Sequence, residues 1–171
     1  VKDTTAKKAK GPMSIEKFIK SDAKVMKGLT TVYQQDGKFF LNINDSLIGK
    51  DLVMVSRLHK GAEGVRSDFD GYAGDELANG VFRFEKNPLN NQIFLTAVTF
   101  KERSSEVMPE SVEMSNRPAI VAAFDIKAQS ADKKDNIIDM SNALISDSEY
   151  LFFRKYHKIT MKLGNLQKDK S

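Results

Sequence analysis

The sequence of 171 residues contains no cysteine, no tryptophan, only four prolines and only two histidines. Without cysteine the chain can form no disulfide, offer no thiolate nucleophile and bind no zinc through sulfur. It also lacks an apolar run near the roughly 20 residues that a membrane-spanning helix needs. The sequence therefore excludes disulfides, cysteine nucleophiles and zinc bound through cysteine. It does not indicate the cellular compartment.

The residues that are present are typical of a globular protein. Hydrophobic residues make up 40% of the chain and charged residues 29%. This composition and length fit one domain with a single core. The net charge of +4 comes from lysine-rich ends, and the segment between them is net negative. Proteins that bind nucleic acid usually place their basic residues on one folded face among aromatic platforms, so we expect no nucleic-acid partner.

The same charge pattern divides the chain into three parts. Residues 1–11 contain no large apolar side chain after Val1, so we expect a flexible basic lead-in. Residues 12–153 form the expected β-rich domain. Residues 154–171 form a basic tail, which we expect to continue into a domain outside this sequence.

Two segments of the expected domain have helical patterns. Residues 12–26 place Ile15, Phe18 and other apolar residues near helical spacing, with Ser14 as a plausible N-cap. Residues 139–146 predict a second, short helix that Asp139 or Ser141 caps.

Strand patterns dominate the remainder. Residues 29–34 and 38–44 flank Asp36-Gly37, a strong hairpin signal, and residues 81–86 and 92–100 predict a second hairpin. The continuous apolar run 52–55 predicts a central strand that is covered on both faces. Further expected elements are a buried strand at 119–126, a charged turn at 128–136, a short strand at 150–153 and another near Val112.

These elements predict an α+β, β-rich fold. We expect a mostly antiparallel sheet of about seven strands, with one N-terminal helix and one short helix in the C-terminal half.

No residue of the sequence is assigned a catalytic, cofactor-binding or metal-binding role. His59 and His157 are far apart and belong to no H-E-x-x-H pair, so we expect two surface histidines. Ser56, Ser104 and Ser105 lack the context of a nucleophile elbow. Both glycine-rich nucleotide-binding motifs are absent as well.

The segment 59–79 is rich in glycine and predicts a long loop. Residues 68–76 of this segment hold four carboxylates, Asp68, Asp70, Asp75 and Glu76, which have the chemistry that Ca²⁺ prefers. Their spacing does not fit an EF-hand, and Asp and Gly also form ordinary turns. Calcium binding and a purely structural loop both remain open.

Several segments resemble, in order and spacing, the N-terminal region of large secreted bacterial zinc-dependent metalloproteases. The expected helix at 12–26 precedes them, and the match covers nearly the whole chain after residue 11. The segments are IGKDLVMVSRLHKGAEGVR (48–66), GYAGD (71–75), VFRFEK (81–86), RPAIVAAFDIKA (117–128) and IIDMSNALISDSEYLFF (137–153).

The resemblance implies a non-catalytic β-rich region that precedes a metzincin-like catalytic domain. The zinc ligands of such a domain have no matching positions here, so zinc is expected in the catalytic domain and no cofactor in this chain. The implied partners are the remainder of the protease and a protein or peptide substrate. The implied location is secreted, periplasmic or outer-membrane-associated, with no membrane span, because members of that family are lipid-anchored or exported.

Three functions remain as hypotheses. The first is an accessory region that supports the protease, keeps it latent or presents substrate along a sheet edge. The second is a free-standing periplasmic or surface module that binds peptide or glycan. The third is a calcium-dependent structural domain centred on residues 68–76.

Overall fold

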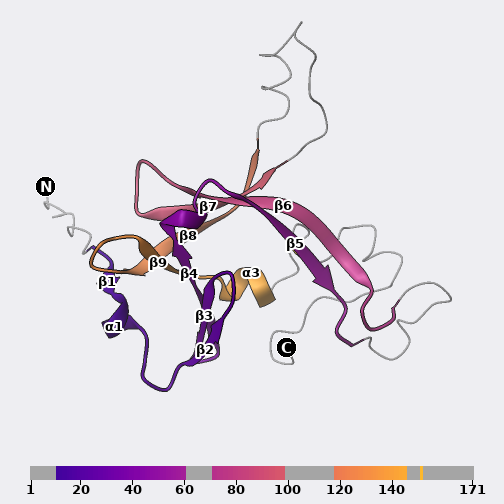
Figure 1. Cartoon of the computed structure of the whole chain (residues 1–171), viewed down its shortest axis with the longest axis horizontal. Helices are drawn as coiled ribbons and strands as arrows, with labels where there is room; N and C mark the ends of the chain where they lie inside the picture. Colours follow the sequence, from indigo (N-terminus) through magenta and orange to yellow (C-terminus); the bar gives the residue numbers. More distant parts are fainter. Residues whose placement is uncertain (1–10, 61–70, 99–117, 146–150, 152–171) are drawn as a thin grey trace, which may run out of the picture.

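The computed structural model of the chain describes residues 11–60, 71–98, 118–145 and 151 (Figure 1). Within these residues the chain forms strands, two short α-helices and one 3₁₀ helix. The elements are β1 (Met13–Ser14), α1 (Ile15–Phe18), β2 (Lys24–Lys27), β3 (Thr31–Gln35), β4 (Lys38–Asn44), η1 (Asp45–Leu47), β5 (Asp51–Arg57), β6 (Glu76–Lys86), β7 (Gln92–Val98), β8 (Ala119–Gln129), β9 (Asp135–Asp139) and α3 (Ser141–Ile145).

The strands form one nine-stranded sheet with the order β2-β3-β4-β9-β8-β7-β6-β5. All neighbours along this path are antiparallel, and β1 adds a short parallel pairing to β8. The predicted β-rich, mostly antiparallel fold is therefore confirmed, with more strands than the seven expected.

Strand β8 joins the two halves of the sheet. Its residues 119–125 pair with β7, and its residues 126–129 pair with β9 across an irregularity in register. An irregularity of this kind bends a strand and increases its twist. The long β5–β6 ribbon consequently runs away from the smaller β2–β4 meander (Figure 1).

The main hydrophobic core lies between these two halves. Ile43 of β4 and Ile138 of β9 pack with Phe82 and Phe84 of β6 and with Leu95 of β7. Apolar residues of β5, β8 and α3 complete the same cluster. Both halves of the sheet thus bury apolar surface in one core, which is the main source of stability in a domain of this size.

A second, smaller core lies on the opposite face of β4 and β9. Phe40 and Ile137 are buried there, and Ile15 and Phe18 of α1 pack against them. The rings of Phe18 and Phe40 meet edge to face, with centroids 5.1 Å apart and planes at 86°. Helix α1 therefore covers this face of the sheet, although it is only one turn long.

Both predicted hairpins are confirmed. The first joins β3 to β4 through Asp36 and Gly37, whose φ angles of 51° and 70° are those of a tight hairpin turn. The second joins β6 to β7. Strand β6 already begins at Glu76, inside the loop that we expected to reach residue 79.

The expected helix over residues 12–26 is wrong except for its single turn at Ile15–Phe18. Ile19 has extended backbone angles and ends the helix. Residues 24–27 pair with β3 instead, as strand β2. An isolated helix of this length is marginal, and the neighbouring β3 offers backbone partners that override the local pattern.

The expected central position of residues 52–55 is also wrong. Strand β5 ends the strand order, and its residues alternate between partly buried and exposed. The apolar run reflects two faces with different roles: Leu52 and Met54 pack against the core, whereas Val53 and Val55 are exposed.

The C-terminal half follows the prediction in part. Strand β8 occurs where a strand was expected, but Ala119, Ile120 and Ala123 are exposed, so only one of its faces is buried. The charged turn is shorter than expected, because β8 reaches Gln129 and β9 starts at Asp135. Helix α3 lies within the predicted range, and Asp139 Oδ1 accepts a hydrogen bond of 3.0 Å from the Ser141 amide, as a cap does.

The expected strand near Val112, the lead-in 1–10, the tail 154–171 and most of the expected strand 150–153 lie outside the described residues. Among the residues that the structure describes, neither helix has the length and apolar character to cross a membrane.

Candidate functional site

The residues that the sequence raised as catalytic candidates do not meet in the described structure. His59 is exposed just after β5, and the Ser56 hydroxyl donates a hydrogen bond to the Leu151 carbonyl oxygen. His157, Ser104 and Ser105 lie outside the described residues. The Ser56 hydroxyl therefore makes a structural contact, which joins β5 to Leu151.

The acidic loop is described only from residue 71 onward. Asp75 Oδ2 accepts hydrogen bonds from the backbone amides of Gly71 and Tyr72, at 2.8 and 2.7 Å. Glu76 forms an ion pair of 3.7 Å with Arg57 and accepts a hydrogen bond from the Asn79 amide. These two carboxylates shape the turn before β6. Asp68 and Asp70 lie outside the described residues, and the described ones hold no group of three metal-ligating side chains.

A cavity of about 260 Å³ lies between α3 and strands β7 and β8. The described residues that line it are mainly apolar: Leu95, Val121, Ala122, Phe124, Ala143 and Leu151, with the polar Asn142. These described residues offer apolar contact and include no titratable group that could move a proton.

A more polar hollow of about 500 Å³ lies where β1 meets the end of β8. Asp125 borders it and accepts hydrogen bonds from Gln92 Nε2 at 2.9 Å and from Lys127 Nζ at 3.3 Å. The hydrogen bond from Gln92, and then that from Lys127, lower the pKa of Asp125 below its ordinary value. Asp125 is therefore a stable carboxylate near neutral pH, and its partners are the protein's own.

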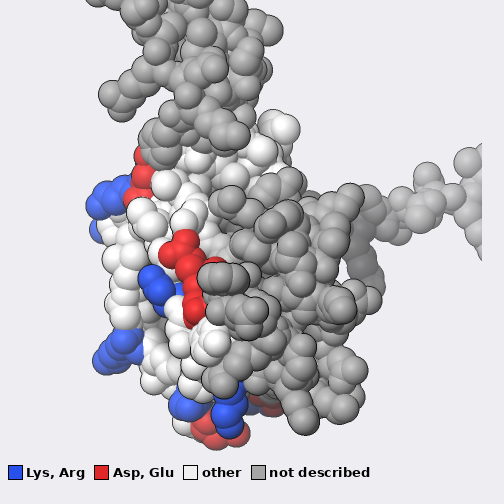
Figure 2. Space-filling view, turned by 90° about the vertical axis from the view of Figure 1, so that its right-hand side faces the viewer, with Lys and Arg blue, Asp and Glu red and all other residues white. Residues whose placement is uncertain are grey.

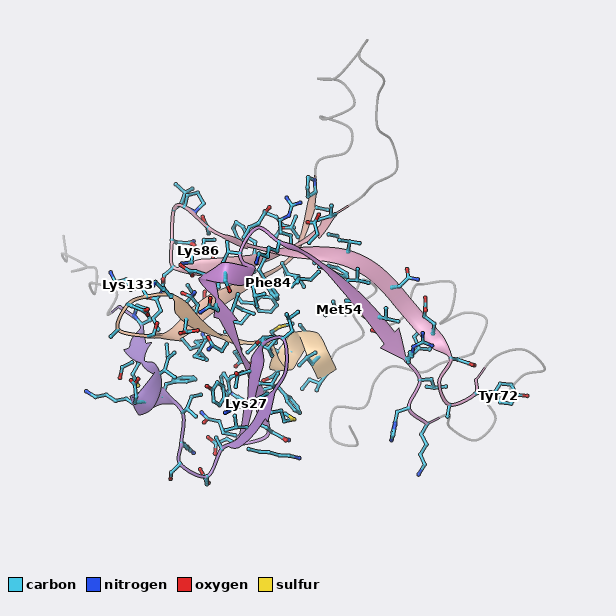
Figure 3. The ribbon with its side chains drawn as sticks, viewed as in Figure 1. Lys27, Met54, Tyr72, Phe84, Lys86 and Lys133 are labelled. Atoms are coloured by element: carbon cyan, nitrogen blue, oxygen red, sulfur yellow. The ribbon has the colours of Figure 1, made fainter. Side chains whose placement is uncertain are left out.

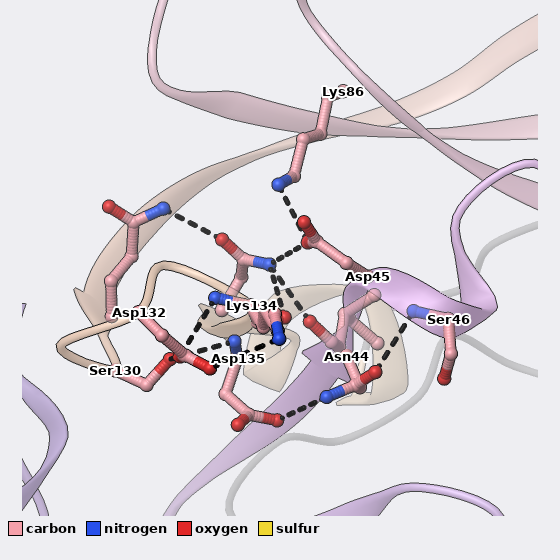
Figure 4. A network of polar contacts seen from close by, with 11 residues as sticks. Asn44, Asp45, Ser46, Lys86, Ser130, Asp132, Lys134 and Asp135 are labelled. Carbon is pink, nitrogen blue, oxygen red and sulfur yellow. Dashed lines mark hydrogen bonds and ion pairs between the residues drawn. The ribbon is translucent and has the colours of Figure 1, made fainter.

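The densest polar network ties β4, η1 and β9 together (Figure 4). The fully buried Asn136 amide donates to the Ile43 carbonyl at 3.0 Å and to Asp45 Oδ1 at 2.9 Å. Lys86 Nζ lies 2.6 Å from the same Asp45 oxygen. Asp135 Oδ1 accepts from Asn42 and Asn44, at 3.0 and 2.9 Å. Most of these groups satisfy one another, so the network is a structural tie rather than an open binding site. Among the described side chains, the buried Asn42 Oδ1 has no hydrogen-bond partner.

The two edge strands of the sheet differ in how they face solvent. Strand β2 has only four residues and begins and ends with lysine, features that protect an edge from pairing with other strands. Strand β5 has seven residues, and the exposed fractions of Val53 and Val55 are 75% and 45%. Figure 3 labels Met54 of β5 and Lys27 of β2, which belong to the two strands at opposite ends of the strand order. Among the strands that the structure describes, β5 ends the strand order, and this edge, together with its outer valines, is the candidate functional surface.

The outer face next to this edge continues onto β6. Val53 pairs with Val81, and Asp51 pairs with Arg83, whose guanidinium lies 2.7 Å from the carboxylate. On the side of the molecule in Figure 2, basic and acidic side chains alternate over the described surface, without a broad patch of one sign. The surface thus combines two exposed valines with an ion pair at its border.

The sequence contains one pattern that predicts this surface, although the continuous apolar run 52–55 favours a strand covered on both faces. Asp51, Val53, Val55 and Arg57 occupy alternate positions, so they share one face of a strand. Charged residues at both ends of that set predict an exposed face with two valines between them.

Comparison with known families matches two consecutive parts of the chain. Residues 12–61 match the domain of unknown function DUF5118, and residues 74–171 match the domain of unknown function DUF5117. No curated protein and no solved structure matches the chain. Because the second match covers more than half of the sequence, the chain belongs to the DUF5117 family of domains of unknown function.

Proposed function

We propose that this chain is the non-catalytic accessory region of a secreted zinc-dependent metalloprotease, and that its β5 edge docks against the remainder of that protein. The observation that carries the proposal is the exposure of Val53 and Val55, at 75% and 45%, on a seven-residue edge strand. Long apolar edges tend to pair with another strand, and burying the valines stabilises that contact.

The occupant to which we commit is a later part of the same polypeptide. Leu151 lies beside β5, because its carbonyl oxygen accepts the hydrogen bond from Ser56. Residues 152–171 follow directly. A segment that follows Leu151 in the same polypeptide is tethered to this domain, and a tethered segment acts at a high effective concentration.

In this proposal the fold is an α+β, β-rich scaffold that supports the catalytic domain or holds it latent. Zinc belongs to the catalytic domain, outside this sequence. The location is secreted, periplasmic or outer-membrane-associated, reached by export or through a lipid anchor. The resemblance of residues 12–153 to such proteases motivates these assignments.

The first experiment measures the intact mass and the zinc content of the natural protein that contains this chain. A species much larger than 19.2 kDa that carries zinc is expected. A zinc-free species near 19.2 kDa would contradict the proposal and favour a free-standing module that binds peptide or glycan.

The second experiment tests the docking edge in the full-length natural protein by hydrogen exchange. We expect the backbone amides of β5 to exchange more slowly there than in the 171-residue chain, and Val53→Lys to remove that protection because it places a charge in the contact. Val25→Lys is the matched control, since Val25 is an exposed valine on the other edge strand. Equal exchange in the long and short proteins would refute docking at β5.

A further inference from the structure

Beyond its proposed role, we infer that the two family-matching segments are obligate partners. Residues 12–61 complete the sheet of residues 74–171, and neither segment forms a stable fold without the other. The sequence comparison separates two domains, whereas the structure places them in one sheet with one core.

In the strand order, strands of residues 12–61 lie on both sides of the strands of residues 74–171. Strands β6 to β9 belong to residues 74–171 and are adjacent in the sheet. Strand β4, from the first segment, pairs with β9 at one side of this group, and β5, also from the first segment, pairs with β6 at the other. Among the described strands, the first segment therefore covers both edges of the group β6 to β9.

The hydrophobic core is shared in the same way. Ile43 of the first segment is fully buried against residues of the second, including Phe84, Leu95 and Ile138. Leu52 and Met54 of β5 pack against the same cluster. Separation of the segments would return this apolar surface to water, and the loss of burial destabilises each part.

Polar contacts between the two segments make their association specific. Asn136 of β9 donates to the Ile43 carbonyl and to Asp45, both in the first segment. Lys86 and Arg83 of β6 form ion pairs with Asp45 and Asp51, at 2.6 and 2.7 Å. Without β4, the buried amide of Asn136 would lose these acceptors, which is costly in a core.

The partner that residues 74–171 require is thus defined by its chemistry. It supplies one strand that carries Ile43 and forms backbone hydrogen bonds with β9. It also supplies a second strand that pairs with β6 and packs Leu52 and Met54 against the core. In this protein the partner is residues 12–61 of the same chain.

The test introduces a specific protease site between residues 61 and 70, the stretch that lies between the two matches and joins β5 to β6. The full chain is folded first, checked by circular dichroism against the unmodified chain, and then cut. We expect the cut chain to elute as one particle of unchanged size on gel filtration in native buffer. Separation into two species, either of which retains cooperative unfolding, would overturn the inference.

A pair of variants of the cut chain measures whether the shared core holds the segments together. We expect Ile43→Ala to weaken the association roughly 30-fold or more, because truncating a buried Ile leaves a cavity. Val25→Ala, on the exposed β2 strand, should change the dissociation constant less than roughly three-fold. Equal effects of the two substitutions would contradict a shared core as the cause of association.

Discussion

The side-chain amide of Asn136 and the backbone carbonyl of Ile43 are joined by a hydrogen bond of 3.0 Å between neighbouring strands β9 and β4. Both residues are fully buried. Asn136 Oδ1 also accepts a hydrogen bond of 2.7 Å from Gln129 Nε2, so the amide uses both of its ends. This single side chain therefore links three strands, β4, β9 and β8, inside the core.

Replacing Asn136 by Ala should destabilise the chain measurably. The substitution leaves the Ile43 carbonyl and the Asp45 carboxylate without this donor, and an unsatisfied buried group costs about 1–3 kcal/mol. Urea unfolding followed by circular dichroism gives the free energy of unfolding. Asn90→Ala is the control, because Asn90 is exposed in the β6–β7 turn. Equal stability of the two variants would show that the hydrogen bonds of Asn136 make no net contribution to the free energy of unfolding.

Two isoleucines on the same sheet should differ strongly in their response to truncation. Ile138→Ala removes a fully buried side chain from the main core, and we expect a loss of about 2–5 kcal/mol. Ile120→Ala removes a side chain that is 57% exposed, and we expect a change within about 0.5 kcal/mol. Thermal or urea unfolding of both variants measures the difference. A large loss at Ile120 would indicate that its face is covered in solution.

The β3–β4 turn should depend on glycine at position 37. Gly37 has a φ of 70°, and a residue with a Cβ in the left-handed region loses about 1–2 kcal/mol. We therefore expect Gly37→Ala to lower the free energy of unfolding by about that amount. Gly28→Ala is the matched control, since an added Cβ there would meet only ordinary contact, 3.7 Å from the Thr30 carbonyl oxygen. Equal losses would mean that the turn adopts another conformation.

The exposed Asp132 should titrate below the ordinary aspartate range. Its pKa is lowered first by the hydrogen bond from the Ser130 hydroxyl, at 2.6 Å, and then by that from the Lys134 amide. Because the folded pKa lies below the unfolded one, its contribution to stability is present above the unfolded pKa and is lost as pH falls through the folded pKa. Ser130→Ala should move the pKa of Asp132 up toward its ordinary value of 3.8.

Carboxyl-carbon NMR during an acid titration measures this change directly. Asp125 serves as an internal control, because Gln92 and Lys127 lower its pKa and Ser130 does not contribute. An unchanged pKa of Asp132 in Ser130→Ala would contradict the assigned cause. A parallel rise at Asp125 would instead indicate a general change of the fold.

The sequence predicted local features well where a short signal decides the conformation. Asp36-Gly37 predicted the first hairpin, and both residues adopt the positive φ that the turn requires. The position of α3 followed from Asp139 and Ser141, which form the predicted cap contact. Strand β9 was missed because its apolar part is only Ile137-Ile138, too short for a period to be visible between a turn and a helix.

The candidate surface could not be predicted from local pattern. An apolar run such as residues 52–55 occurs both in central strands and in edge strands. The position of β5 in the sheet depends on which other strands pair with it. The lack of an assigned catalytic residue in the sequence remains a prediction, since His157, Ser104 and Ser105 are outside the described residues.

The sequence by itself determined the β-rich class, the two hairpins, the short helix before residue 146 and the absence of cysteine chemistry. These depend on composition and on contacts between near neighbours in the chain. Only the tertiary structure decided that residues 24–27 form a strand, that β5 is an edge and that residues 12–61 enclose residues 74–145. The physical reason is that backbone pairing and core burial join residues far apart in sequence, such as Ile43 and Asn136, and no local period records such partners.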